Sequence, residues 1–478
     1  MPLKGGGFLK KHNRSMLEGP LLPSIISYTI PIILTSVLQL LFNAADLVIV
    51  GRFCGSVSVA AVGATGAITN LIVNLFVGLA IGAGVTVAHA LGAKEDSAVH
   101  RAIHTLMPTA LVSGVVLTVI GVTFSKDLLE MMGTDPDVLP LSTVYMQIYF
   151  GGITFNMVYN FCSSALRAAG DTKSPLIFLS IAGVANVLLN VIFVTVFHMN
   201  VAGVALATTI SQGISAVLVV IALMRRTDSC RLDLRKMHFY KAQLLKMIRI
   251  GLPAGIQGSL FSISNVMIQS SINSFGKLAM SGNAAAGNID GFIYVGMNAF
   301  QQTTVNFVGQ NIGAHQYKRV KQTLSISLVC TFLVGVGISF VAYQFAETLL
   351  GFYITDSLEA IQYGLLRMSI MTTTYFLCGL MENVTGALRG MGASTTPMVV
   401  SILGVCGFRL GWVFTIFQIP EYHTLEWLYL SYPISWIATG LVQLISFIVI
   451  YRRRVRWDQQ YVLKGLNAQG TSQNYKGE

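Results

Sequence analysis

Long apolar runs without charge alternate with short polar connections along this chain, a pattern that predicts helices crossing a membrane. Six runs free of Asp, Glu, Lys and Arg each exceed the roughly 20 residues that span a bilayer as an α-helix. Two longer runs supply three more spans, and three further spans each hold one interior charge, at Asp290, Glu382 and Arg409. We therefore expect twelve transmembrane helices in an all-α fold. The six runs are 21–45, 102–125, 138–166, 250–276, 322–346 and 427–451, and the two longer ones are 53–93 and 174–224.

The sequence contains an internal repeat. Ala165-Leu166-Arg167 and Gly170 recur as Ala387-Leu388-Arg389 and Gly392, an offset of 222 residues that also relates Pro31 to Pro253. Each half is about the length of a six-helix bundle, and an even number of spans gives both halves the same orientation. We expect two parallel six-helix repeats, and duplicated bundles of this kind commonly hold a substrate path. Transport is therefore the leading functional hypothesis.

A basic stretch between the two halves marks the boundary of the lobes. We expect a cytoplasmic N-terminal segment at 1–20, an N-lobe at 21–224, a basic cytoplasmic linker at 225–249, a C-lobe at 250–452 and a cytoplasmic tail at 453–478.

Composition and charge support the membrane interpretation. Hydrophobic residues make up 53% of the chain and charged residues only 11%, too little to cover a water-soluble surface. Of the 31 Lys and Arg residues, 26 fall in alternate connections and four in the others, with Arg409 inside a span. By the positive-inside rule both termini are cytoplasmic, and the net charge of +11 reflects topology and lipid contact rather than nucleic acid. We expect a multi-pass membrane protein.

Cysteine and histidine spacing suggests neither a disulfide framework nor a metal centre. The six cysteines are scattered, and no His-Glu-x-x-His pattern occurs. No nucleophile constellation is visible either, so we expect no enzyme activity and no cofactor.

Asp46 is the main candidate for ion coupling. It follows the uncharged run 21–45 directly, at the end of the first span, and an ionised carboxylate inside a span is costly unless it is paired, hydrated or protonated. Gln39 and Asn43 share its helix face at spacings of seven and three residues, and we assign both to substrate binding. Proton or sodium occupancy would then control the charge on Asp46. The alternative is that Asp46 lies near the outer headgroups and contacts water.

Neutral oxygens on two other spans can complete a cation site. Asn186 and Asn190 lie one turn apart on the fifth span, and Thr208 lies in the sixth. We assign all three, with Asp46, to cation coupling; the alternative is that they only bond neighbouring helices.

The second half holds its own intramembrane charges. Asp290 and Glu382 are candidates for a substrate-binding cavity that attracts cations, although an internal salt bridge to Arg409 would also explain them. Tyr149 and Asn156 are further substrate-binding candidates, because they belong to aromatic and methionine-rich segments suited to flat organic molecules.

Three motifs give the chain a family resemblance. Asp46-Leu47-Val48-Ile49-Val50-Gly51-Arg52, Gly92-Ala93-Lys94 and the doubled Ala-Leu-Arg-x-x-Gly loops occur in the order found in the multidrug and toxic compound extrusion (MATE) family. From residue 21 to 451 the chain resembles these secondary transporters, in particular the bacterial branch related to DNA-damage-inducible protein F.

The resemblance implies a monomer in which two six-helix lobes form a V. It also implies efflux of small organic, frequently cationic or amphiphilic, compounds by antiport with H⁺ or Na⁺. Asp46 resembles the acidic residue of the family's N-lobe cation site, with Gln39, Asn186 and Thr208 as its polar surroundings. Asn190 departs from the pattern, since many relatives have Asp there, and this favours H⁺ over Na⁺. The alternative function is a flippase for lipid-linked precursors, which would need a cavity richer in basic residues.

Overall fold

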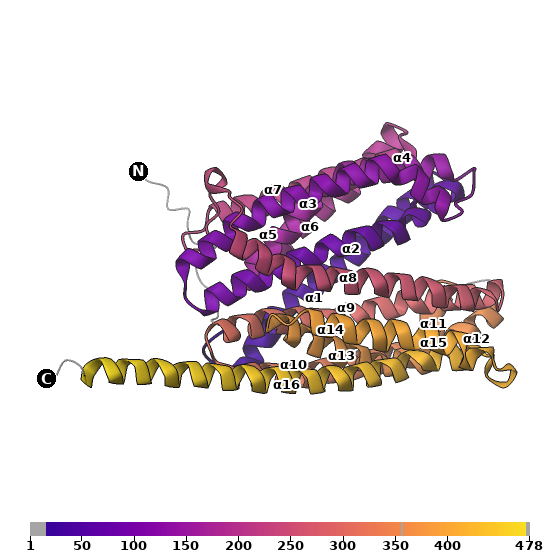
Figure 1. Cartoon of the computed structure of the whole chain (residues 1–478). Coiled ribbons are helices and arrows are strands. Elements are labelled where there is room, and N and C mark those ends of the chain that lie inside the picture. The colour runs from indigo at the N-terminus through magenta and orange to yellow at the C-terminus, as the bar shows by residue number, and fades with distance from the viewer. Residues whose placement is uncertain (1–15, 355–356, 475–478) are drawn as a thin grey trace.

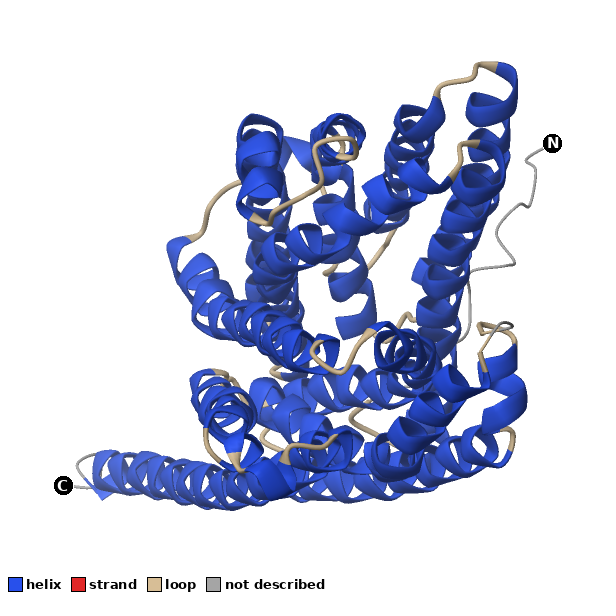
Figure 2. Ribbon diagram, turned by 90° about the vertical axis from the view of Figure 1, so that its right-hand side faces the viewer, coloured by secondary structure: helices blue, strands red, loops and turns tan. Residues whose placement is uncertain are grey.

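A computed structural model describes residues 16–354 and 357–474 of the chain. Within those ranges every regular element is a helix or a helical turn, and no strand is present (Figure 2). The predicted N-terminal segment therefore lies outside the described residues up to residue 15, as do the last four residues of the predicted tail.

The first half forms one bundle of six helical runs, because its apolar stretches are separated by polar or glycine-containing turns (Figure 1). The fourth run breaks between α4 and α5 at Gly152, and the fifth ends in a π-helical turn, η1. The elements are α1 (Leu21–Phe53), α2 (Ser56–Gly92), α3 (Asp96–Met131), α4 (Leu139–Gly151), α5 (Ile153–Ala168), α6 (Lys173–Val191), η1 (Ile192–Val196) and α7 (Asn200–Met224).

The second half repeats this order after the turn η2 (Leu234–Lys236) in the linker, and its first helix begins inside the predicted linker range. Its fourth run is also interrupted, here by the π-helical turn η3. The elements are α8 (Lys241–Asn273), α9 (Lys277–Gly313), α10 (Tyr317–Gln344), α11 (Ala346–Gly351), α12 (Leu358–Arg367), η3 (Met368–Thr372), α13 (Thr373–Gly390), α14 (Thr395–Ser401), η4 (Ile402–Gly407), α15 (Phe408–Phe414), η5 (Ile416–Gln418), η6 (Pro420–Tyr422) and α16 (Leu425–Asn474).

The two predicted lobes and the twelve helical runs are confirmed. Eight of the helices in the described ranges are long and apolar enough to cross a bilayer by length and composition. The other four runs are α4–α5, α8, α9 and α12–α13, each of which is interrupted by a turn or carries more polar residues. The chain is a multi-pass membrane protein.

The backbone preserves the duplication at its turns. Residues in the left-handed region, which glycine adopts without steric cost, occur at equivalent places in both halves. After α5 the chain closes a Schellman turn, in which the Asp171 N–H donates to the Leu166 carbonyl (2.9 Å). The Ala393 N–H donates to the Leu388 carbonyl at the same distance. The equivalent pairs are Gly55 and Gly276, Lys94 and His315, and Gly170 and Gly392, with φ of 88° and 95°, 56° and 56°, and 89° and 80°.

The lobes meet along α2 and α8, where small residues let the backbones touch. A Cβ on Gly78 would overlap backbone atoms of Gly251 and Gly255, and one on Gly82 would overlap Met247 and Gly251. Close helix approach of this kind is typical of membrane bundles, in which packing rather than the hydrophobic effect holds helices together.

The lobes lie close together at one end of the bundle and diverge toward the other, where α4 and α12 lie (Figure 1). We call the close end the basic face, because the basic linker lies there together with the connections 93–95, 169–172, 314–316 and 391–394, whose flanking helix ends carry Lys and Arg. The end where the lobes diverge is the open face.

Candidate functional site

A polar cluster surrounds Asp46 inside the N-lobe. The Asn190 amide donates to Asp46 Oδ1 at 2.5 Å, and the Thr208 hydroxyl donates to Oδ2 at 3.5 Å. Asn190 also donates to Asn186 Oδ1 at 3.3 Å, while the Asn186 amide lies 3.4 Å from the Thr208 hydroxyl. The structure therefore brings together, from α1, α6 and α7, all four residues predicted for cation coupling.

One oxygen of this cluster has no hydrogen-bond partner. Asn190 is fully buried, and its Oδ1 contacts no donor in the described part of the chain. An unsatisfied buried carbonyl oxygen is costly unless a donor or a cation approaches it. The Asp46 carboxylate and the oxygens of Asn186, Asn190 and Thr208 are the ligand types that hard cations such as Na⁺ prefer.

The equivalent place in the C-lobe is apolar. The repeat offset of 222 carries Asp46 onto Ile268 and Asn190 onto Trp412. Ile268 is 0% exposed and Trp412 is 8% exposed, and both belong to one buried hydrophobic cluster. The polar cluster is therefore confined to one of the two repeats.

A second polar region is a cavity of about 350 Å³ between the lobes. It receives side chains from α1, α2 and α5 of the N-lobe and from α8, α9 and α13 of the C-lobe. Eight amide side chains dominate its polar wall: Gln39, Asn74, Asn160, Gln257, Asn298, Gln301, Gln302 and Asn306.

Glu382 is the acid that lines this cavity. It is 6% exposed and accepts a hydrogen bond from Gln301 Nε2 at 2.7 Å. Gln39 lines the same cavity from α1, so two of the residues predicted for substrate binding meet there.

Two arginines, which the sequence did not suggest as site residues, also line the cavity. Arg167 donates to Gln302 Oε1 at 2.5 Å, and Arg389 donates to Gln257 Oε1 at 2.9 Å. Both are the arginines of the doubled Ala-Leu-Arg motif. The recurrence of the motif was the available signal, but we took the arginines for residues of the basic connections.

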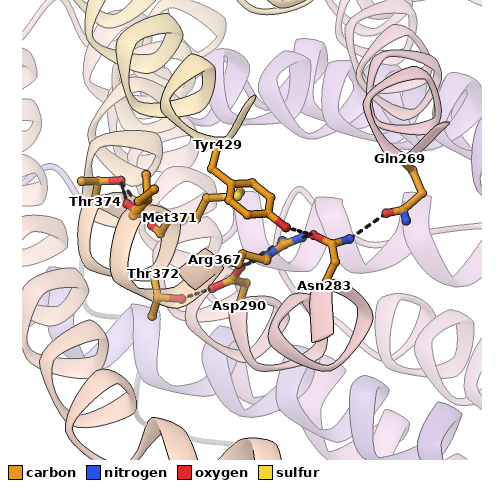
Figure 3. A network of polar contacts seen from close by, with 9 residues as sticks. Gln269, Asn283, Asp290, Arg367, Met371, Thr372, Thr374 and Tyr429 are labelled. Atoms are coloured by element: carbon orange, nitrogen blue, oxygen red, sulfur yellow. Dashed lines mark hydrogen bonds and ion pairs between the residues drawn. The ribbon is translucent and has the colours of Figure 1, made fainter. Parts of the chain in front are cut away.

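Asp290 lies elsewhere, in a buried network of the C-lobe (Figure 3). It is 2% exposed and pairs with Arg367 at 3.0 Å, while the Thr372 hydroxyl donates to its other oxygen at 2.6 Å. Arg367 donates as well to Asn283 at 2.5 Å, and the Tyr429 hydroxyl donates to the same Asn283 oxygen at 3.2 Å. Asp290 therefore has its own cation and is not among the residues lining the cavity.

Arg409 is not the ion-pair partner expected from the sequence. In the described ranges it makes no salt bridge; its guanidinium lies 4.0 Å from the centre of the Tyr432 ring and donates to Ser435 Oγ at 2.9 Å. Aromatic faces attract a guanidinium, so Arg409 needs no carboxylate. Arg367, one of the four basic residues that we counted from the sequence in the other connections, is the ion-pair partner of Asp290 instead.

The remaining candidates lie away from the cavity lining. Asn43 is exposed on α1, about one turn from Asp46 on one side and one turn from the cavity residue Gln39 on the other. Tyr149 stacks on Tyr145 with ring centres 6.3 Å apart, and Asn156 accepts a hydrogen bond from Asn160 at 2.8 Å. Asn160 lines the cavity and Asn156 does not, so Asn156 is one contact removed from it.

A reciprocal clasp closes the cavity at the basic face. His89 of α2 donates from Nε2 to the Gly390 carbonyl at 2.7 Å, and Gln310 of α9 donates to the Ala168 carbonyl at 2.6 Å. The two donors are repeat equivalents, and so are the two acceptors at the ends of α13 and α5. Thr29 and Thr303 add an inter-lobe contact at 2.8 Å.

In the described part of the chain no group of three or more His, Cys, Asp or Glu side chains could hold a metal ion. The cluster and the cavity thus define two sites in a two-lobed membrane bundle, one carboxylate site within a lobe and one amide-rich cavity between the lobes.

Comparison with known proteins identifies this class. The MatE family model matches residues 31–192 and 253–414, one match in each repeat. The chain is 26% identical over 428 residues to the probable multidrug resistance protein YoeA of Bacillus subtilis, covering 88% of this chain and 92% of that protein. It is 19% identical to the multidrug export protein MepA of Staphylococcus aureus, covering 94% and 98%.

Solved structures share the fold. An outward-facing MATE family transporter of the MOP superfamily aligns with a TM-score of 0.84 at 20% identity, covering 94% of this chain and 99% of that one. A MOP superfamily transporter from Pyrococcus furiosus aligns with a TM-score of 0.81 at 18% identity, covering 95% and 98%. The fold and the two matched repeats together define a membrane transport protein. The chain belongs to the MatE family, that of the MATE transporters.

Proposed function

We propose that the protein exports small organic compounds by antiport with H⁺ or Na⁺. The observation that carries this proposal is the Asp46 cluster, in which one carboxylate is held by two neutral donors and, among the residues that the structure describes, is bonded to no basic side chain. A carboxylate so placed changes charge when a cation arrives, because no fixed counter-ion already neutralises it. Several relatives are named as multidrug resistance or export proteins, which supports organic compounds as the cargo.

Helix α1 supplies a mechanical connection between the ion site and the lobe interface. Its first half packs on the C-lobe, where Tyr28 meets Phe307 edge to face with ring centres 5.4 Å apart. Its second half carries Asp46 and packs on α6. Pro31 lies between these halves, at a position where the helix lacks one backbone donor. Charge neutralisation at Asp46 would therefore act on the same helix that closes the basic face.

The coupling ion is chosen by the oxygens around Asp46. The site offers a single carboxylate, which suits a proton, and an unsatisfied Asn190 oxygen, which suits a metal cation. Because Asn190 contributes no charge, we propose H⁺ as the principal ion. The antiporter would act as a monomer in a bacterial inner membrane, with the basic face and both termini in the cytoplasm, as the charge bias favours.

The test is reconstitution into sealed vesicles. Export of the cationic dye rhodamine 123 is measured under an imposed proton gradient alone, then under a sodium gradient alone. We expect the proton gradient to drive export, and Asp46→Asn to abolish the gradient dependence. Asp127→Asn, which alters an exposed carboxylate near the end of α3, is the matched control. Gradient-driven export that survives in Asp46→Asn would contradict the assignment.

A lipid-precursor flippase is a second candidate. The specific observation in its favour is that Arg167 and Arg389 line the cavity, since a lipid diphosphate needs basic partners. Glu382 in the same wall argues for antiport as the leading proposal.

A further inference from the structure

Arg167 and Arg389 are brought to one cavity by the internal duplication. Each stands in the last turn of the fourth span of its lobe, and each span ends in the same Schellman turn. The clasp from His89 and Gln310 binds the carbonyl one residue beyond each arginine. Pseudo-symmetry therefore places two guanidinium groups at the closed end of the cavity, one from each lobe.

The charges on the cavity wall are unbalanced. Its Lys, Arg, Asp and Glu side chains are two arginines and Glu382, so the formal sum is at least +1. Among the described residues neither arginine makes a salt bridge within 4.0 Å, and Glu382 is held by Gln301 instead. Glu382 precedes Arg389 by seven residues, about 10 Å along the helix axis.

Arg389 has donor capacity left over. It is 6% exposed, and its Nε is buried without a hydrogen-bond partner, while one terminal nitrogen donates to Gln257. A buried guanidinium with an open donor is costly until an acceptor reaches it. The planar fork of arginine suits two-oxygen acceptors, namely carboxylate and phosphate.

We propose that Arg167 and Arg389 form an anion subsite, in which a carboxylate or phosphate group of the transported compound binds at the closed end of the cavity. This inference rests on the proposed export function and adds to its cargo a class of compounds that carry an anionic group. Glu382, two helical turns from Arg389, would bind a cationic group of the same transported molecule. The cavity of about 350 Å³ is at the small end of the range for organic ligands.

The subsite is tested with two dyes that share a xanthene core, anionic carboxyfluorescein and cationic rhodamine 123. Binding to the purified full-length protein is followed by fluorescence anisotropy. We expect Arg167→Gln and Arg389→Gln each to weaken carboxyfluorescein binding by at least about tenfold, the loss typical of one charge-assisted hydrogen bond. Rhodamine 123 binding should be unchanged or tighter, which also reports that the variants are folded.

Arg409→Gln is the matched control, because it removes a buried arginine of the same lobe that is absent from the cavity lining. It should change neither affinity. Where Arg389→Gln does not fold, Arg389→Lys keeps the charge but loses the fork and should weaken carboxyfluorescein binding by a smaller factor.

Farnesyl diphosphate and inorganic diphosphate serve as competitors that distinguish the source of the anion. Displacement by both at similar concentrations indicates a water-soluble anion, whereas preferential displacement by the farnesyl compound indicates a lipid headgroup; either supports the subsite. The inference is overturned if carboxyfluorescein does not bind, or if neither Arg→Gln variant weakens it. If vesicles still export rhodamine 123 in that case, the export function stands without the subsite; if no gradient moves either dye, the export function itself is wrong.

Discussion

At the scale of single residues, the carboxylates Asp46, Asp290 and Glu382 have three different environments, and each environment decides the role of its residue. Asp46 contacts only neutral donors, Asp290 is paired with Arg367, and Glu382 faces the cavity. A carboxylate with a fixed counter-ion cannot change charge without losing that interaction, which is why we assign ion exchange to Asp46 and structure to Asp290.

Adding a second carboxylate to the Asp46 cluster should change its ion preference. In Asn190→Asp two acids would share the site, and their mutual repulsion is relieved best by a bound metal cation or proton. We expect export to become stimulated by a sodium gradient, measured in vesicles at fixed pH. Asn273→Asp, an exposed position at the end of α8, is the control. An export rate that ignores sodium in Asn190→Asp would count against the cluster as the ion site.

Breaking the Asp290 pair should destabilise the C-lobe. Arg367→Gln leaves a buried carboxylate without its cation, a loss that in proteins amounts to about 3–5 kcal/mol. We expect a marked fall in the thermal unfolding midpoint of the detergent-purified protein. The double variant Arg367→Gln/Asp290→Asn should recover much of the loss, because no unpaired charge remains; equal destabilisation of single and double variants would contradict the pairing argument.

At the scale of helices, the contact between α2 and α8 is a matter of backbone distance rather than side-chain chemistry. Glycine is required at Gly78 because any side chain would meet the backbone of Gly251 and Gly255. Such overlap must separate the helices, and with them the lobes.

Gly78→Val should therefore destabilise the protein by more than the about 1–3 kcal/mol typical of an overpacked core, since the obstacle is backbone. The unfolding midpoint in detergent is the measurement. Gly63→Val is the matched control, because a Cβ at Gly63 has nothing within 4 Å. Equal midpoints for the two variants would show that α2 and α8 are not packed this closely.

The sequence predicts the helices, but it predicts the residues of the candidate sites only in part. Uncharged runs of 20 residues and more can only satisfy their backbones in lipid as helices, so the twelve spans were predictable. The Asp46 cluster was predictable because Asp46 is a charge within a span and Asn186 and Asn190 lie one helical turn apart on another span. The cavity positions of Gln257 and Gln301 were not predictable, because the sequence does not distinguish an amide that lines a cavity from one that bonds a neighbouring helix. The ion-pair partner of Asp290 was not predictable either, because it depends on tertiary packing.

At the scale of the whole molecule, the lobes are joined at the basic face and separate at the open face. The Thr29–Thr303 contact joins α1 to α9, the glycine approach joins α2 to α8, and the clasp joins α2 and α9 to the ends of α13 and α5. Alternating access requires these contacts to break and the lobes to close at the other end.

A disulfide across this interface should lock the transporter. In Thr29→Cys/Thr303→Cys the sulfurs replace hydroxyl oxygens that lie 2.8 Å apart, close enough for a bond after small adjustment. We expect oxidation to stop dye export by the vesicles while dye binding persists, and a reductant to restore export. The single variants are the controls. Undiminished export by the cross-linked protein would show that the basic face need not open.

Because Ile268 and Trp412 occupy the C-lobe positions equivalent to Asp46 and Asn190, the absence of a second polar cluster there affects how much charge each transport cycle moves across the membrane. If the Asp46 cluster alone binds the coupling ion, the proposed antiport exchanges one monovalent cation for one cargo molecule per cycle. Returning a proton inward while a monovalent cation leaves transfers no net charge, whereas expelling a monovalent anion adds two inward positive charges per turnover. Across 100 mV, negative inside, those two charges contribute about 4.6 kcal/mol, so membrane voltage alone would power the discharge of acidic cargo and leave basic cargo dependent on pH.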